Sequence, residues 1–431
     1  MTSNAQEKLD YIAGTKTAIK DAIEAKGVVV GSATFRQYAD KIADIPTGGG
    51  SGDYKVQFFD PFGVLLKVEY VNEGENATPP TPPTLDLLTF NHWNHPGTNI
   101  TRDENIGAIY DTTDGKTYIF VHVNSKTGLQ PTIYLQKSTA DKMTIDWGHG
   151  DDSVTSDSGT ITIQKPSEYT EGWYTITITC AGVYNLGQGA NTTTLFGAYD
   201  GTYAKITQKV YFGANTTTLN NYVLYGHDGL DSILASSNFT GSIGTRAFRD
   251  CYSLASLTLP SGMTGSIGAN AFNNCYSLAS LTLPSGMTGS IEASAFYNCY
   301  SLASLTLPSG MTGSIGDTAF ASCYSLASLT LPSGMTGSIG DAAFDSCVSL
   351  ASLTLPSGMT GSIGEYAFGD MVSIEEFIFQ TATPPTLTKE AFGTLPLTCR
   401  IYVPDANVAD YKDASNWVAY KDYIYSINDR P

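Results

Sequence analysis

Few residues of this chain have the type and spacing that metal binding or catalysis requires. His92 and His95 lie three apart in NHWNHP, and in a helix two such imidazoles can share a metal ion. Pro96 and the strand-like sequence around it argue against a helix there. The loop DWGHGDD at 146–152 carries carboxylates of the kind that Ca²⁺ prefers, but not the spacing of a defined calcium loop. We therefore expect a solvated turn at 146–152 and no metal at either place.

The signature motifs of the large enzyme classes are also missing from the sequence. It contains no G-x-S-x-G nucleophile elbow, no phosphate-binding loop and no carboxylate pair in a distinctive setting. We expect a protein that is not an enzyme, with no catalytic residue and no cofactor. An enzyme that uses the loop at 146–152 is the weaker hypothesis.

Five of the seven cysteines occupy one position of a repeat, at intervals of 24 residues. This spacing is not that of a zinc site, and no histidine accompanies it. Stacked strands lie about 4.8 Å apart, so disulfides between successive cysteines stay open as an alternative. Met371 occupies the equivalent position of the sixth repeat, where it could not form a disulfide. This favours the interpretation that the cysteines are small buried apolar side chains. The five are Cys251, Cys275, Cys299, Cys323 and Cys347.

The repeat itself extends over half of the chain. Cys251–Asn274 reads CYSLASLTLPSGMTGSIGANAFNN, and Cys275–Asn298 reads CYSLASLTLPSGMTGSIEASAFYN. A unit of 24 residues cannot bury its apolar face alone, so the pattern predicts a solenoid whose core forms between stacked coils. Leu195 and Leu219 are in phase with the isoleucines of the later blocks, which extends the solenoid over 185–404, about nine coils.

Each unit carries the motif A-F-x-x-C-x-x-L-x-x-L-x-L-P, for example from Ala271 to Pro284. The SLTL segment is expected to be a strand with leucines inward and Ser and Thr outward, and A-F-x-x-C a tight helical turn. This motif resembles the BspA-like leucine-rich repeat over roughly 185–430. The resemblance implies a curved, right-handed solenoid used mostly for adhesion. Residues 405–431 read as a short helix and a last strand, a cap that hides the open edge.

Two β-rich modules precede the solenoid. Residues 114–184 contain alternating strands, and MTIDWGHGDD followed by YTITIT resembles a PKD-type immunoglobulin-like sandwich. Residues 54–113 alternate around a DPFG turn and resemble the internalin-type β-grasp repeat, which implies a spacer or adhesion module without catalysis. The residues that carry the second resemblance are Asp60, Gly63, Leu65, Gly74, Ala77, Pro79, Pro82, Phe90 and Trp93.

The start of the chain has a different character. Apolar stripes at helical spacing over Leu9–Ile23 and Thr34–Ile45 predict a helical anchor at 1–46, and 47–53 is a flexible Gly/Ser linker. The segment 15–50 resembles the short N-terminal modules of tailed-bacteriophage structural proteins, fibres especially, which implies attachment to the virion. The whole chain is thus expected to be mainly β and multi-domain, with a short helical anchor.

Charge and hydropathy exclude several classes of function. The net charge is −18, and no Lys, Arg or His occurs from Cys251 to Thr388. Nucleic-acid binding needs basic side chains, so we exclude it for the repeats. No apolar run reaches the ~18 residues of a membrane helix, and the first residues lack the basic and apolar parts of a signal peptide.

These features favour a structural protein of a bacteriophage virion, a head or tail fibre or appendage. Residues 1–46 are expected to bind other virion proteins, and the solenoid a protein or glycan of the bacterial surface. Fibres are usually symmetric, so we expect a homo-oligomer such as a trimer, located in the virion after synthesis in the host cytoplasm. The alternative is a bacterial cell-surface adhesin of the BspA-like type, which should carry a signal peptide or a lipidation cysteine near its start.

Variation between the coils concentrates beside the Ala-Phe pair, either because this strip binds a partner or because exposed positions are weakly constrained. The outward threonines of the strands form a second, uncharged candidate surface. Four tyrosines in register from Tyr252 to Tyr324 either pack between coils or offer their rings to sugars. The predicted strip consists of Arg246, Arg249, Asn270, Asn273, Tyr297, Asp317, Asp341, Asp345, Glu365 and Tyr366.

Overall fold

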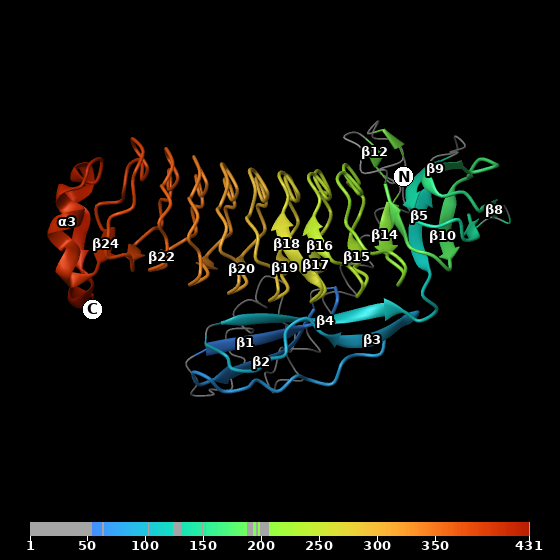
Figure 1. The fold of residues 1–431 in the computed structure, drawn as a ribbon, viewed down its shortest axis with the longest axis horizontal. Helices are drawn as coiled ribbons and strands as arrows, with labels where there is room; N and C mark the ends of the chain where they lie inside the picture. The colour runs from blue at the N-terminus through green and yellow to red at the C-terminus, as the bar shows by residue number, and fades with distance from the viewer. Residues whose placement is uncertain are drawn as a thin grey trace, which may run out of the picture.

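The computed structural model shows an elongated, mainly β protein (Figure 1). A row of stacked coils forms the long axis, with a helical cap at the C-terminal end, a β-sandwich at the other end and a four-stranded sheet along one side. The predicted anchor at 1–46 and the linker at 47–53 lie outside the described residues. Within the described part, no helix is long and apolar enough to cross a membrane. The structure describes residues 54–430 except 63, 102, 124–130, 149, 151, 188–192, 195–196 and 199–206.

The four-stranded sheet is built by residues 54–112, here called the N-terminal module. Its strands are β1 (Tyr54–Phe59), β2 (Leu65–Val71), β3 (Leu88–Trp93) and β4 (Glu104–Thr112). They lie in the order β2-β1-β4-β3, with β1 parallel to β4 and the outer pairs antiparallel. Strands β1 and β2 confirm the prediction of strands on either side of the DPFG segment, and Val56 and Phe58 of β1 alternate into the core. The likeness to the β-grasp repeat stays a prediction.

The described residues of the predicted DPFG turn form a turn between β1 and β2, and Gly63 lies outside them. Asp60 Oδ1 accepts hydrogen bonds from the backbone N–H groups of Phe62 and Val64, both at 2.8 Å. This is the local side-chain-to-backbone bonding that makes Asp a turn residue.

After the N-terminal module, the chain forms two facing sheets. The membership of residues 114–184 in the immunoglobulin-like family stays a prediction. Trp147 and Tyr169 are fully buried, and the Tyr169 hydroxyl donates to the Trp147 carbonyl at 2.7 Å. One sheet has the order β15-β14-β5-β10-β7-β8 and the other β11-β6-β9. The strands of this region are β5 (Thr117–Val123), β6 (Thr132–Lys137), β7 (Met143–Asp146), β8 (Asp152–Thr155), β9 (Gly159–Gln164), β10 (Gly172–Cys180), β11 (Tyr184–Leu186), β12 (Thr193–Thr194) and β13 (Gly197–Ala198).

The sandwich and the solenoid share one sheet and one core. β14 (Thr207–Tyr211) pairs antiparallel with β5, and β15 (Ser232–Leu234) pairs parallel with β14. The main apolar core runs without interruption from Ile119 to Ile424. The sandwich therefore covers the edge that the first coil would otherwise expose, which is how solenoids avoid edge-to-edge aggregation.

The solenoid makes about nine turns, as the period predicts. Successive strands pair in parallel at a shift of one repeat, for example Leu257 with Leu281. A second ladder joins the isoleucines, from Leu219–Ile243 to Ile363–Leu387, which confirms the phase for the described coils; Leu195 lies outside the described residues. The strands are β16 (Gly241–Ile243), β17 (Ser256–Thr258), β18 (Met263–Ile267), β19 (Ser280–Thr282), β20 (Ser304–Thr306), β21 (Ser328–Thr330), β22 (Ser352–Leu355), β23 (Glu376–Phe379) and β24 (Arg400–Val403).

The A-F-x-x-C segments differ from the single tight helical turn that the sequence suggests. The N–H groups of Asn270, Phe272 and Asn274 donate to carbonyls of the next coil at 2.8–2.9 Å, so they are not available for a continuous helix. Each segment is a run of turns in which Asn270 and Asn274 have φ of 57° and 61°. Every regular coil repeats these two left-handed positions, which Gly, Asn and Asp adopt at least cost.

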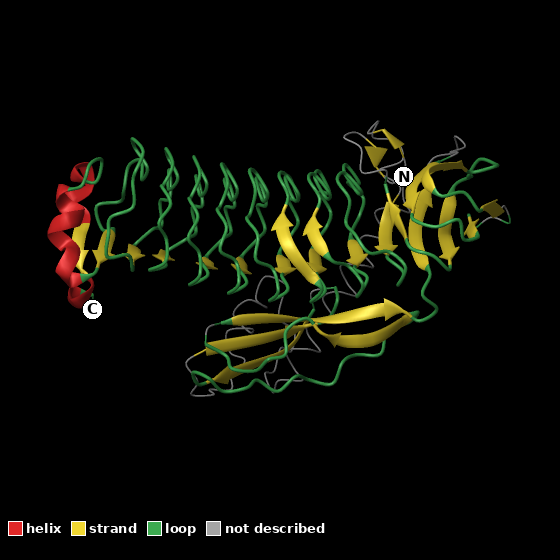
Figure 2. Ribbon diagram, in the orientation of Figure 1, coloured by secondary structure: helices red, strands yellow, loops and turns green. Residues whose placement is uncertain are grey.

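The C-terminal residues close the last coil (Figure 2). Trp417 is buried, and its Nε1–H donates to the Pro385 carbonyl at 2.8 Å, while Asn416 Nδ2 donates to the Leu387 carbonyl. These bonds satisfy carbonyl groups of the last coil, so the cap that the sequence predicts has a physical basis. Its elements are η2 (Asp405–Asn407), α3 (Val408–Asp413), η3 (Val418–Tyr423), β25 (Ile424–Ser426), which extends the sheet beside β24, and η4 (Ile427–Asp429).

Candidate functional site

The cysteine ladder lies inside the solenoid and is structural. Cys275 Sγ donates to the Phe248 carbonyl of the preceding coil at 3.1 Å, and the other four repeat cysteines make the equivalent bond at 3.0–3.2 Å. Burial raises the pKa of these thiols, for Cys347 to about 12. All seven cysteines, each within the described residues, are free and buried. The structure thus agrees with the apolar alternative rather than with disulfides.

We expect the folded protein to react negligibly with a thiol-specific reagent such as Ellman's reagent. A thiolate is the reactive species, and burial both blocks access and disfavours the charged form. After unfolding in guanidinium, seven thiols per chain should react. Absorbance at equilibrium measures both counts, and fewer than seven thiols in the unfolded chain would reveal disulfides.

The tyrosine ladder packs between coils. The rings of Tyr252, Tyr276, Tyr300 and Tyr324 stack at centroid distances of 4.9, 4.8 and 5.0 Å and are within 10° of parallel. Each inner ring therefore has both faces covered by its neighbours. Since sugar stacking needs a free ring face, the ladder stabilises the solenoid and does not form a row of sugar sites.

The predicted strip beside the Ala-Phe pairs is partly occupied by contacts within the chain. The guanidinium groups of Arg246 and Arg249 lie over the rings of Tyr222 and Tyr225, at 5.4 and 5.8 Å from the centroids. Arg246 also donates to the Tyr222 hydroxyl. Asn273 is 6% exposed, and its Nδ2 donates to Asn270 Oδ1 at 2.9 Å. These side chains thus bind their own solenoid.

Farther along the strip, three of the four acidic residues are exposed, and two of them also join coils. Asp317 Oδ1 accepts from the N–H of Asp341 at 3.0 Å, and Asp341 Oδ1 accepts from the N–H of Glu365 at 2.7 Å. Tyr366 is exposed and donates to Glu390. Tyr297 and Asp345 are half-buried. The residues of the strip are therefore distributed over successive coils along the length of the solenoid. None of them lines either of the two cavities described below.

The outward threonine face is covered in its first coils by the N-terminal module. Thr258 and Thr282 are each only 4% exposed, so the expectation that they lie on an open face is wrong. Asn94 Nδ2 lies 3.4 Å from the Leu259 carbonyl, and the Ser256 hydroxyl donates to the Phe62 carbonyl. The module packs here because β4 lies directly on β17 and β19.

Polar and aromatic contacts extend this interface. Asp111 accepts hydrogen bonds from the backbone N–H and the hydroxyl of Ser237, at 3.1 and 2.8 Å. The ring of Phe62 stacks on Tyr211 at 5.9 Å. His92 Nε2 lies 2.9 Å from Ser261 Oγ, so this histidine belongs to the interface.

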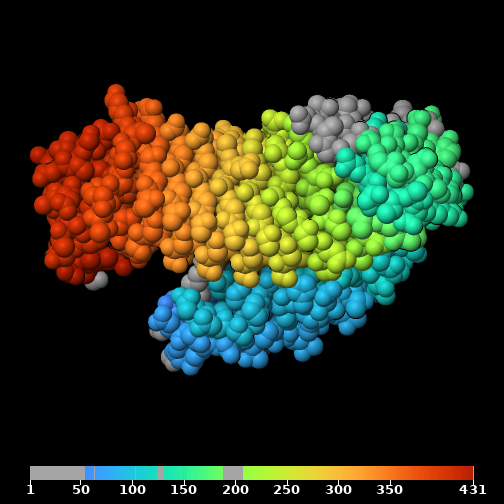
Figure 3. All heavy atoms as spheres, in the orientation of Figure 1, coloured from blue at the N-terminus to red at the C-terminus, as the bar shows by residue number. Residues whose placement is uncertain are grey.

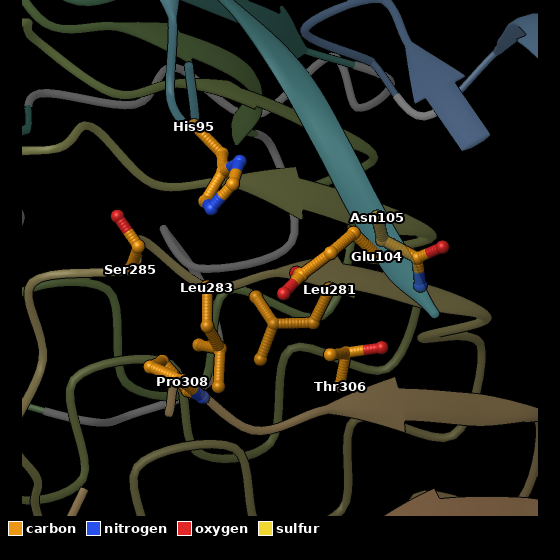
Figure 4. Close-up of a pocket in the computed structure, with 8 residues that line it drawn as sticks. All are labelled: His95, Glu104, Asn105, Leu281, Leu283, Ser285, Thr306 and Pro308. Atoms are coloured by element: carbon orange, nitrogen blue, oxygen red, sulfur yellow. The ribbon is translucent and has the colours of Figure 1, made fainter. Parts of the chain in front are cut away.

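A small cavity of about 10 Å³ remains between the two parts (Figure 4). His95, Glu104 and Asn105 line it from the module, and Leu281, Leu283, Ser285, Thr306 and Pro308 from the solenoid. It has room for about one water molecule and is too small for a substrate. Among the described residues no group of three or more His, Cys, Asp and Glu could hold a metal, and His149 and Asp151 of the predicted loop lie outside them.

The close packing of the module makes Gly107 critical. A Cβ at Gly107 would lie 2.3 Å from Thr258 Cγ2, so Gly107→Ala should weaken the docking of the module by about 1–3 kcal/mol. We expect faster proteolysis of residues 54–112 with little change in the unfolding of the solenoid. Adding Thr258→Gly to Gly107→Ala should restore protection, and failure of this rescue would argue against the observed interface.

Beyond the module, the strand face is open and forms a groove of about 480 Å³. Thr101 of the module borders it at one end, and the outward side chains of β21 and β22 form its floor. Within the described part of the chain, none of the side chains lining the groove is charged. The lining residues are Thr101, Ser309, Ser328, Leu329, Thr330, Leu331, Ser333, Ser352, Thr354, Pro356 and Gln380.

The sequence identifies part of this groove but not its limits. Thr330 and Thr354 belong to the predicted outward row, and both retain some exposure. The border formed by Thr101 comes from a contact between residues more than 200 positions apart, which no local pattern records. The space-filling view shows the module lying against only part of the solenoid's length (Figure 3).

Comparison with known proteins identifies the repeats. Residues 199–313 and 265–398 match the family model for the BspA type Leucine rich repeat region, with six copies. No curated protein matches the chain.

Solved structures of leucine-rich repeat proteins are similar to about half of the chain. A leucine-rich repeat protein from Bacteroides ovatus is 19% identical over 52% of this chain and 67% of its own, with a TM-score of 0.36. The leucine rich repeat protein of T. pallidum is 27% identical over 46% of this chain and 85% of its own, with a TM-score of 0.30. A leucine rich cell surface protein from Faecalibacterium prausnitzii is 19% identical over 52% and 85%, with a TM-score of 0.27.

Proposed function

Because residues 199–398 match the family model for the BspA type Leucine rich repeat region, we propose that this protein is an adhesin that binds a surface polymer along its open strand face. The observation that carries the proposal is the uncharged groove of about 480 Å³ on β21 and β22. Its volume lies within the range of ligand sites, ~300–1,000 Å³. The module leaves this part of the face free while it covers β17 and β19.

The chemistry of the groove suits a neutral glycan. Serine, threonine and glutamine side chains both donate and accept hydrogen bonds, as sugar hydroxyl groups do. The same pair of Ser and Thr hydroxyl groups recurs on β20, β21 and β22 at a strand spacing of about 4.8 Å, which suits a polymer with repeating units. A phosphate-rich ligand would find no cation among the lining residues.

The location of the adhesin has two candidates. We propose a cell-surface protein of the BspA-like type first, because the repeat region supports this family. A head or tail fibre or appendage of a bacteriophage virion is the second candidate, supported by the resemblance of segment 15–50 to phage structural modules. In that case residues 1–46 would bind other virion proteins, and the chain would form a homo-oligomer such as a trimer.

A pair of matched variants tests the groove. Thr330→Arg places a bulky cation in it, whereas Thr360→Arg places the same side chain at an exposed threonine outside it. We expect Thr330→Arg to weaken binding of the fluorescent protein to intact bacterial cells at least roughly tenfold, since the large cationic side chain occupies the space that the ligand would fill. Thr360→Arg should bind as the natural protein does. Equal binding by all three proteins would refute the groove as the binding site.

Mass spectrometry separates the two locations. The protein should be found either among surface-labelled proteins of the bacterium or in purified phage particles. Size-exclusion chromatography with light scattering of the full chain then tests the oligomer, and a monomer would argue against the fibre arrangement.

A further inference from the structure

The four tryptophans of the chain, all within the described residues, differ in their surroundings. Trp147 and Trp417 are fully buried, and Trp93 packs against Phe58 and Phe90 at 5.4 and 5.6 Å. Trp173 is 67% exposed. A single exposed apolar side chain needs no explanation by itself, so what matters is how the ring of Trp173 is held.

Trp173 is held in a defined position. It lies on β10 directly opposite His122 of β5, at the outer face of the six-stranded sheet. The two rings stack with centroids 4.2 Å apart and planes within 12° of parallel. The imidazole therefore covers one face of the indole and fixes its orientation, and the other face points away from the stack. Little conformational entropy is lost when a ligand binds such a prearranged ring.

An aromatic row leads from this pair toward the N-terminal module. Phe120 lies two residues before His122, on the same side of β5. Its ring centroid lies 6.4 Å from that of Tyr118 and 5.1 Å from that of Tyr211. Phe62 of the module covers Tyr211. The row is thus closed by the module at one end and ends in the exposed indole of Trp173 at the other.

The indole has a polar neighbour on the same face of the sheet, which suits a sugar. Thr175 is the next outward residue of β10 after Trp173, about 7 Å along the strand. A single indole face is far smaller than the ~800 Å² that each partner contributes to a stable protein interface. It matches one pyranose ring, whose C–H groups are attracted by the negative face of the indole while its hydroxyl groups bond to neighbouring polar side chains.

We infer that the Trp173–His122 pair is a carbohydrate-binding platform for a neutral oligosaccharide, separate from the groove on the solenoid. The two sites lie on different elements, since β5 and β10 belong to the sandwich and β21 and β22 to the solenoid. The experiment below therefore tests the platform independently of the proposed groove.

The experiment uses the full chain labelled with ¹⁵N, whose four indole N–H groups give separate signals in ¹H–¹⁵N spectra. Chitotetraose, cellotetraose, mannotetraose and maltotetraose serve as probes. We expect one or more of them to shift the Trp173 signal, assigned with Trp173→Phe, in a saturable way. A single aromatic contact contributes little, so the dissociation constant should be in the millimolar range.

Variants complete the test. Trp173→Ala should weaken binding of the active oligosaccharide roughly 3–10-fold and lower the melting temperature only slightly, because the side chain is mostly exposed and loses one ring contact. Val154→Ala removes another exposed apolar side chain of the same sheet and should bind normally. The platform is refuted if no oligosaccharide shifts the Trp173 signal more than it shifts the signals of the other three tryptophans. It is also refuted if Trp173→Ala binds the active oligosaccharide as tightly as the natural protein does.

Discussion

Phe320→Ala is expected to lower the free energy of unfolding by about 3–5 kcal/mol. Phe320 is fully buried, and its ring stacks between Phe296 at 5.1 Å and Phe344 at 5.4 Å. Its removal leaves a cavity between two coils, which the stacked backbone cannot close by moving one coil alone. Guanidinium unfolding followed by circular dichroism measures the loss.

The control lies four residues later in the same coil. Tyr324 stacks on Tyr300 at 5.0 Å but is 44% exposed, so Tyr324→Ala should cost only about 1 kcal/mol. If the two substitutions destabilise the protein equally, the stability of the solenoid does not come from its internal aromatic ladder.

Acidification should destabilise the solenoid through His227. Burial lowers the pKa of this imidazole from 6.5 to about 3. The folded state therefore keeps it neutral, while the unfolded chain takes up a proton below about pH 6.5. Its contribution to stability is fully present above pH 6.5 and falls as the pH drops toward 3. At about pH 4.5 the loss should reach roughly 3 kcal/mol, measured by guanidinium unfolding across the pH series.

His227→Cys isolates this effect from the titration of the carboxylates. Residue 227 lies one period before Cys251, so cysteine is the residue that the repeat itself places at this position. A buried thiol stays neutral in acid, and the variant should therefore keep the stability that the histidine loses. The two proteins should differ little at neutral pH and most near pH 4.5. Parallel pH profiles would show that His227 does not titrate on unfolding.

The sequence predicts the solenoid well because its information is local and repeated. The inward Phe272, Cys275 and Leu281 follow from one unit, and the period then carries them to every other coil. The same counting could have identified His227 as a buried member of the cysteine ladder. Strand alternation likewise predicts β1, β5 and β10, since each has one buried face.

Contacts between distant segments could not be predicted in this way. The module covers Thr258 because Gly107 allows β4 to approach, and neither residue by itself indicates the other. The left-handed positions beside the Ala-Phe pairs were also missed. Asn270 and Asn274 suit these positions, whereas other coils place residues such as Thr318 and Ala342 in the same left-handed conformation.

In the candidate site, too, some features follow from the local sequence pattern and others depend on contacts between distant segments. Outward threonines such as Thr330 follow from strand periodicity, whereas the end of the groove at Thr101 depends on docking. Trp173 is an ordinary strand residue in the sequence, and only its stack on His122 and its exposure distinguish it from the buried tryptophans.

The near-identity of the central coils has an evolutionary consequence. The coils from Cys275 to Ser346 make equivalent hydrogen bonds to the coil before and the coil after, so their contact surfaces are interchangeable. Unequal crossing-over between such gene segments adds or removes whole coils and leaves the sandwich, the module and the cap unaltered. Each added coil lengthens the open part of the groove by about 4.8 Å, because the module covers a fixed number of strands. Recombination alone can thus adjust the length of the open strand face.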